Sequence, residues 1–240
     1  MIREFFSSSI EKVRESSFGS KLKASPYFAT IVISFLIVAA GINIFIELSA
    51  NVKAELMGGF DKNITDSILA LRSPSLTEYF TFVTDVGDVQ GYLVVVLLCS
   101  GLIFYVFRKW NYVVQVILVL FLATISNVIL KRVFDRARPD IEHLVSVKTL
   151  SYPSGHAMSS MAFYGFLIYL VYKFQIPVWM KLILTSILLL LIISIGTSRI
   201  YLGVHFPSDV LGGWIAGGIW VFFCIVVFNL IETFRRDPLT

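Results

Sequence analysis

Long apolar runs separated by short polar segments dominate the hydropathy pattern of the chain. Six of them approach the length of about 20 residues that a helix needs to cross the hydrocarbon core of a membrane. These runs cover residues 27–48, 89–107, 113–130, 157–171, 178–197 and 210–228. The fourth run is short, and its helix is expected to begin about a turn earlier, inside residues 153–156. The pattern predicts an all-α polytopic membrane protein, a bundle of six transmembrane helices.

The composition supports a membrane protein and excludes an ordinary soluble one. Hydrophobic residues make up 57% of the 240 residues and charged residues 15%, against about a quarter in soluble domains. The net charge of +4 lies mostly in the segments between apolar runs, where Lys and Arg set membrane orientation, so no nucleic-acid partner is expected. Cys99 and Cys224 lie inside apolar runs and are expected to be small buried hydrophobes, not a disulfide or a metal pair.

The longest stretch outside the apolar runs covers residues 49–88. Asp61 is predicted to cap a short helix there, and a second short helix is predicted over residues 75–82. Both helices are expected to lie along the outer membrane surface. This stretch belongs to a membrane domain predicted over residues 27–231.

The two ends of the chain are predicted to lie outside the membrane domain. Residues 1–26 carry apolar side chains at helical spacing among Arg and Lys, which is typical of a helix in the headgroup layer. A frayed tail explains the same segment equally well. Residues 232–240 are predicted to be a short cytoplasmic tail.

Three polar clusters stand at the predicted outer ends of the third to sixth runs. They are residues 131–139 (KRVFDRARP), 152–156 (YPSGH) and 198–209 (SRIYLGVHFPSD). Each cluster alone has a simple explanation, as a solvated loop, a capped helix start and a helix connection. Ionisable residues that converge at one membrane boundary are candidates for a functional site.

Together the clusters supply the groups that bind a phosphate. Lys131, Arg138 and Arg199 are expected to surround its oxygens, because charge-assisted hydrogen bonds to phosphate are strong. The hydroxyl of Ser154 and the N–H of Gly155, at a helix start, complete the cradle. The sequence therefore predicts an oxyanion site suited to phosphoryl transfer.

Hydrolysis also needs a nucleophile and an acid. Asp209, four residues after His205 on a predicted helical face, is expected to hold that imidazole in one tautomer. His205 would then attack phosphorus and form a phosphohistidine. His156 is expected to protonate the leaving oxygen and later to deprotonate water. No metal-ligand cluster accompanies these residues in the sequence, so no metal and no cofactor are expected.

The clusters resemble, in order and spacing, the signature of the type 2 phosphatidic acid phosphatase family of membrane lipid phosphatases. The resemblance covers about residues 75–230. The matching positions are Lys131 with Arg138-Pro139, Pro153 to His156, and Ser198-Arg199 with His205 and Asp209. The resemblance implies the same roles for the eight residues named above, and a six-span layout with the active site at the outer membrane boundary. Arg132, Arg136 and His143 lie outside the signature. The two arginines are expected to be surface charge, and contact with a second phosphate is the less favoured alternative.

Positive charge predicts the orientation in the membrane. Eleven Lys and Arg residues fall on the side of the termini and nine on the other, of which six remain once Lys131, Arg138 and Arg199 are assigned to ligand binding. The positive-inside rule then places both termini in the cytoplasm and the site outside. The expected protein is a multi-pass cell membrane protein.

The resemblance to bacterial family members implies a lipid phosphate substrate in the outer leaflet. The outward site favours undecaprenyl diphosphate, followed by phosphatidylglycerophosphate and then phosphatidic acid. A lipid phosphotransferase would use the same residues and stays open as an alternative. A non-catalytic lipid or phosphate transporter is disfavoured, because the predicted spans carry almost no ionisable residues at mid-membrane depth. A vanadate haloperoxidase, from a related soluble family, does not fit the apolar runs.

Overall fold

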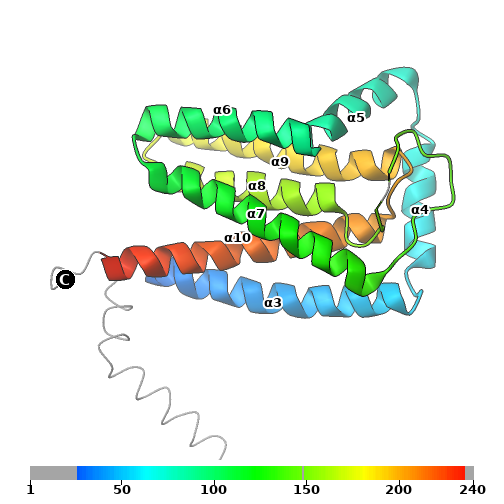
Figure 1. The fold of residues 1–240 in the computed structure, drawn as a ribbon, viewed down its shortest axis with the longest axis horizontal. Helices are drawn as coiled ribbons and strands as arrows, with labels where there is room; N and C mark the ends of the chain where they lie inside the picture. The colour runs from blue at the N-terminus through cyan, green and yellow to red at the C-terminus, as the bar shows by residue number, and fades with distance from the viewer. Residues whose placement is uncertain (1–25, 148, 236–240) are drawn as a thin grey trace, which may run out of the picture. The chain divides into compact units, whose positions relative to one another are not determined.

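The computed structural model describes residues 26–147 and 149–235, and all regular structure in this part of the chain is helical (Figure 1). The all-α prediction is confirmed. The segment predicted as an interfacial helix and most of the predicted tail lie outside the described residues. The helices are α3 (Phe28–Lys53), α4 (Gly58–Leu69), α5 (Pro74–Val86), α6 (Val89–Phe107), α7 (Trp110–Phe134), α8 (Gly155–Lys173), α9 (Val178–Tyr201) and α10 (Pro207–Arg235).

Five of these helices are long and apolar enough to cross a membrane, within the described part of the chain: α3, α6, α7, α9 and α10. Each covers one of the predicted apolar runs, apart from Tyr27, which lies just before α3. The fourth predicted run became α8, which begins at Gly155, as expected, and is 19 residues long. It is absent from the set of five because His156, Ser159 and Ser160 dilute its apolar character. The six-span prediction is therefore supported for five helices only.

The chain divides into two compact units. The described part of the smaller unit consists of residues 26–39 and 222–235, and within it the Tyr27 hydroxyl donates a hydrogen bond of 2.9 Å to Glu232. The larger unit comprises residues 40–221 and contains all the predicted site residues. Within it, α8 packs against both α7 and α9 (Figure 1). Phe163 and Phe166 of α8 are completely buried, so this helix forms the core.

Glycines allow α10 to approach α8 closely. A Cβ atom at Gly217 would lie 2.5 Å from the carbonyl oxygen of Met158, and one at Gly213 would lie 2.6 Å from that of Ser154. Small residues four apart on a helix commonly permit such backbone contact between membrane helices. The approach also brings the start of α10 beside the start of α8, where the Ser154 N–H donates to the carbonyl of Asp209 at 3.0 Å.

The two short helices expected between the first and second runs are present as α4 and α5. Ser73 caps α5, and its N–H donates to the Tyr201 hydroxyl at 2.9 Å, which attaches α5 to the end of α9. The prediction that Asp61 caps the first of these helices is wrong. Helix α4 begins three residues earlier, at Gly58, and the Asp61 carboxylate is buried against the start of α10, where it accepts from the Ser208 N–H at 2.8 Å.

The topology brings the three polar clusters to one end of the larger unit. Helices α7 and α9 end there, while α8 and α10 begin there, and α4 and α5 lie at the same end (Figure 1). Residues separated by more than 70 positions therefore meet in one place.

Candidate functional site

A cavity of about 550 Å³ lies where the three clusters meet. Six of the eight predicted site residues line it: Lys131, Arg138, Gly155, His156, Arg199 and His205. The other two, Ser154 and Asp209, are fully buried next to this lining. The structure therefore brings the predicted phosphate ligands and both histidines together in one place.

His205 and Asp209 form a buried pair just before and inside the first turn of α10. Nδ1 of His205 lies 3.3 Å from Oδ2 of Asp209, and the same carboxylate oxygen accepts from the Ser151 hydroxyl at 2.5 Å and from the Phe206 N–H at 2.8 Å. The helix begins at Pro207, two residues after His205, and the Asp209 carboxylate reaches the imidazole as expected. A carboxylate at Nδ1 favours the tautomer that leaves Nε2 with its lone pair.

The surroundings of His205 keep its imidazole neutral. Burial lowers the pKa of His205 to about 3, although Asp209 opposes the shift, and the cations of Arg138 and Arg199 add to it. Nε2 faces the guanidinium of Arg138, with 3.3 Å between Nε2 and Nη1. A neutral imidazole beside a cationic group is suited to nucleophilic attack on a bound phosphate.

His156, at the start of α8, faces a carboxylate that the sequence analysis did not select. Its Nε2 atom lies 2.8 Å from Oδ1 of Asp88, the residue that precedes α6. The neighbouring His156 lowers the pKa of Asp88, so this carboxylate is ionised at neutral pH. Gly87 makes the contact possible, because a Cβ atom there would lie 2.9 Å from the His156 ring.

Arg199 and Ser154 each carry a buried polar atom that has no hydrogen-bond partner among the described residues. These atoms are Nε of Arg199 and the hydroxyl of Ser154. The guanidinium of Arg199 is otherwise held by Nη1, which donates to the Thr84 hydroxyl. Buried polar groups without partners are costly, and a bound phosphate would supply acceptors for both.

Lys131 and Arg138 reach the cavity from the end of α7 and the chain that follows it. Nζ of Lys131 donates to the carbonyl of Leu150, and Nε of Arg138 donates to the carbonyl of Thr149 at 2.6 Å. Burial lowers the pKa of Arg138, although Asp209 nearby opposes the shift. Both side chains are thus held in the cavity wall by main-chain carbonyl groups.

Gly155 lies so close to Asn127 that a side chain here would force one of the two residues to shift. A Cβ atom at Gly155 would lie 2.9 Å from Oδ1 of Asn127, which is buried on α7 and lines the same cavity. The Asn127 amide donates to the carbonyl of Pro153 at 3.0 Å and so holds the chain before α8. Gly155 and His156 line the cavity, so the free N–H groups at the N-terminus of α8 are available to an anion bound there.

Four residues near the site were missed by the sequence analysis: Asp88, Asn127, Ser151 and Arg136. The interpretation of Arg136 as surface charge is wrong, because its guanidinium contacts Asp209 at 2.6 Å. Asp88 stood directly before a predicted span, which was a usable signal for a group at the membrane boundary. Nothing in the local sequence distinguishes Ser151 or Asn127 from ordinary polar residues.

No three His, Cys, Asp or Glu side chains within residues 26–147 and 149–235 are grouped so that they could hold a metal ion. That the reaction needs no metal stays a prediction.

Comparisons with known proteins identify the family. The PAP2 superfamily matches residues 112–232. Phosphatidylglycerophosphatase B of Bacillus subtilis is 30% identical over 198 residues, which cover 80% of this chain and 95% of that protein. The lipid A 1-phosphatase of Rhizobium etli is 28% identical over 120 residues, 46% of this chain and 47% of that protein.

A solved structure agrees with the sequence comparisons. The crystal structure of a transmembrane PAP2 type phosphatidylglycerolphosphate phosphatase from Bacillus subtilis matches with a TM-score of 0.73 and 27% identity, over 85% of this chain and 98% of that chain. The relatives are named as lipid phosphatases, which confirms the hydrolase class expected from the three clusters. The chain belongs to the PAP2 superfamily of membrane lipid phosphatases.

Proposed function

We propose that the chain hydrolyses the terminal phosphate of a membrane lipid through a phosphohistidine on His205. The observation that carries this proposal is the cavity that collects His205, His156 and three cations around one space. A nucleophile, an acid and a cationic cradle are the three components that phosphoryl transfer to a protein side chain requires.

The first step forms the phosphoenzyme. Nε2 of His205 donates its electron pair to phosphorus while the bond between phosphorus and the leaving oxygen breaks. Asp209 accepts from Nδ1–H and stabilises the positive charge that develops on the imidazole. His156 gives its proton to the leaving oxygen and becomes neutral.

The second step releases phosphate. Neutral His156 accepts a proton from water, the water oxygen attacks phosphorus, and the P–N bond to His205 breaks. The electron pair returns to Nε2, and His156 is again protonated. The reaction needs no other co-reactant than water.

The phosphate is expected to lie between the start of α8 and the three cations. Its oxygens would accept from the orphaned Nε of Arg199, the orphaned Ser154 hydroxyl and the Gly155 N–H. Lys131 and Arg138 would turn from the carbonyl groups they now contact towards the phosphate, because a charged acceptor attracts them more strongly.

A second cavity supports a lipid as the bearer of the phosphate. It measures about 520 Å³ and is lined mainly by apolar side chains of α6 and α7. It shares Asp88, Asn127, Val128, Gly155 and His156 with the polar cavity. Tyr92, Leu93, Ile117 and Phe121 are among its walls. A phosphate in the polar cavity could therefore remain attached to an apolar tail lying between these two helices.

Phosphatidylglycerophosphate is the first candidate substrate, followed by undecaprenyl diphosphate and phosphatidic acid. The sequence alone favoured undecaprenyl diphosphate. We now place phosphatidylglycerophosphate first because the relative named for that activity is matched over 95% of its length.

The orientation proposed is six spans, with α8 as the fourth, both termini in the cytoplasm and the cavity outside. Ser146 is exposed beside the cavity, and Gln175 is exposed in the connection between α8 and α9. A cysteine at Ser146 should react with an impermeant thiol reagent in intact cells, and one at Gln175 only after lysis. The reverse pattern would invert the orientation.

The function is tested by measuring phosphate release from the three lipids by purified protein in detergent, with EDTA present. Release by the wild-type protein and none by His205→Ala is the expected result. Transfer of the phosphate to an added alcohol, without net release, would instead indicate a lipid phosphotransferase. Activity lost with EDTA and restored by magnesium would contradict the metal-free mechanism.

A further inference from the structure

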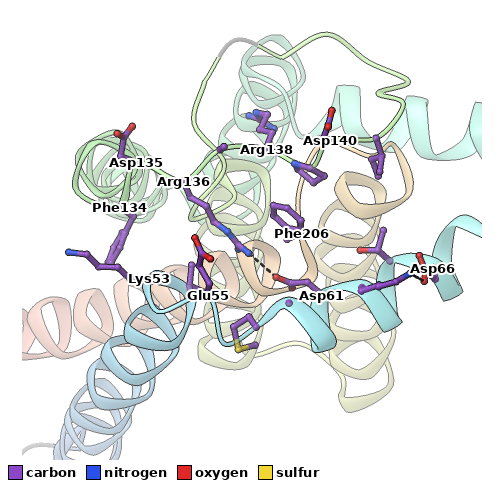
Figure 2. A pocket seen from close by; sticks show the side chains of 18 residues that line it. Lys53, Glu55, Asp61, Asp66, Phe134, Asp135, Arg136, Arg138, Asp140 and Phe206 are labelled. Carbon is purple, nitrogen blue, oxygen red and sulfur yellow. Dashed lines mark hydrogen bonds and ion pairs between the residues drawn. The ribbon is translucent and has the colours of Figure 1, made fainter.

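Arg136 joins two buried carboxylates that come from distant parts of the chain. Its Nη1 atom lies 2.6 Å from Oδ1 of Asp209, and its Nη2 atom lies 2.8 Å from Oδ2 of Asp61. The Asp209 and Asp61 side chains are 0% and 3% exposed. Figure 2 shows the Arg136 side chain extending from the segment after α7 towards Asp61 on α4. A planar fork can serve both carboxylates at once, which an ammonium cannot.

The same guanidinium holds the short turn that follows His205. It lies over the ring of Phe206, with 4.2 Å between its central carbon and the ring centroid, and Nη1 donates to the Ser208 hydroxyl at 2.8 Å. In Figure 2 Phe206 lies close to the end of the Arg136 side chain and to Asp61, and these three residues line another cavity, of about 660 Å³. Arg136 therefore contacts three of the four residues from Phe206 to Asp209.

Asp61 binds both Arg136 and Ser208 at the start of α10. Its carboxylate accepts from the Ser208 N–H at 2.8 Å and from the Ser208 hydroxyl at 2.7 Å, in addition to Arg136. These bonds satisfy donors at the start of α10, where a helix has free N–H groups and favours negative charge. Helix α4 thus anchors both the arginine and the helix start that carries Asp209.

The main chain of Arg136 is also linked to Asp209 through hydrogen bonds of Ser151. Its carbonyl accepts from the Ser151 N–H at 2.9 Å, and the Ser151 hydroxyl donates to Oδ2 of Asp209 at 2.5 Å. Both oxygens of Asp209 are consequently constrained by Arg136, one by its side chain and one through Ser151. Oδ2 is the oxygen that faces Nδ1 of His205.

We propose that Arg136, anchored by Asp61, is a positioning residue for phosphoryl transfer: it holds Asp209 in the orientation that sets the tautomer and direction of His205. This inference rests on the proposed function, because it assigns the nucleophile to His205. Arg136 contacts Asp209 and is not part of the lining of the polar cavity. It therefore contributes to the rate of transfer and not to substrate binding.

The test compares Arg136→Gln, Arg136→Lys and Asp61→Asn with Arg132→Gln, which removes the same charge from an exposed position on α7. Arg136→Gln should lower kcat by about 10- to 100-fold with KM within twofold, since a misplaced catalytic group costs about that much. If Arg136→Gln does not fold, Arg136→Lys provides a folded variant, because it keeps a cation. The kcat of Arg136→Lys should still fall severalfold. Asp61→Asn should behave like Arg136→Lys, and Arg132→Gln like the wild type.

A double-mutant cycle separates positioning from a general structural effect. If Arg136 acts through Asp209, Arg136→Lys should cost less than twofold in an Asp209→Asn background, because the carboxylate it positions is already gone. Equal losses in both backgrounds would overturn the inference, as would wild-type kcat for Arg136→Lys and Asp61→Asn. Wild-type activity of His205→Ala would overturn the proposed function itself, whereas an inactive His205→Ala with additive losses at Arg136 would overturn only this inference.

Discussion

Nε2 of His156 and Oδ1 of Asp88 lie 2.8 Å apart, which joins the start of α8 to the start of α6 at the edge of the polar cavity. Asp88 thereby orients the proposed general acid and stabilises its protonated form. Because an amide keeps the size of the side chain but not its charge, Asp88→Asn should lower kcat about tenfold. Steady-state kinetics on the preferred lipid check this. Asp85→Asn removes a charge from the same cavity lining and is the control. Equal losses in the two variants would contradict a specific role for Asp88.

Replacement of Arg199 by lysine is expected to raise KM and lower kcat, together reducing kcat/KM by about 100-fold. The guanidinium is held by Thr84 through Nη1 and leaves Nε unpartnered for the phosphate, and a lysine ammonium cannot make both contacts. Inhibition by vanadate, a phosphate mimic, provides an independent measure of binding and should weaken in parallel. Unchanged vanadate inhibition in Arg199→Lys would show that Arg199 does not bind the phosphate.

The buried neutral state of His205 predicts how stability depends on pH. The folded-state pKa is about 3, below the ordinary value of about 6.5, so the unfolded chain binds the proton more readily. Its contribution to stability is therefore fully present above pH 6.5 and is lost as the pH falls towards 3. Thermal unfolding in detergent at pH 7 and pH 4.5 should show a larger loss for the wild type than for His205→Gln. Equal losses would mean that His205 is not buried in its neutral form.

Two adjacent glycines of α10 are expected to differ sharply in their tolerance of a methyl group. A Cβ atom at Gly217 would lie 2.5 Å from a main-chain oxygen of α8, whereas at Gly218 nothing lies within 4 Å. Gly217→Ala should therefore destabilise the protein by about 1–3 kcal/mol, as overpacking does. Gly218→Ala should be neutral or slightly stabilising, because alanine favours helix. Thermal unfolding of the two variants checks this, and equal stability would contradict the close packing of α8 and α10.

The helices could be predicted from the sequence because apolar runs are local signals. The run at 89–107 coincides with α6, and the others are extended in the structure by a few residues at polar ends. Helix α8 is the exception, because polar residues near the cavity make it less apolar than the other long helices. Hydropathy alone therefore identifies the helix but does not establish that it crosses the membrane.

The spacing of the three clusters predicted which residues line the cavity, but not which groups hold them there. Asp61 and Arg136 are 75 positions apart, and nothing in the sequence pairs them. For the same reason, the sequence predicts Asp61 as the cap of its own helix, whereas its carboxylate binds the start of α10. Asp88 meets His156 only because Gly87 lets α5 end against the start of α8. Such contacts depend on topology, which local patterns do not contain.

Detection of a phosphoenzyme on His205 during turnover would test the proposed nucleophile directly. Purified protein would be mixed with radiolabelled phosphatidylglycerophosphate, quenched with base within the first turnovers and separated from lipid. The wild type should carry protein-bound phosphate that survives base and is lost in acid, as expected of a P–N bond, and His205→Ala should carry none. An active wild-type protein that carries no such label, or equal labelling of the His205→Ala variant, would contradict the assignment of His205 as the nucleophile.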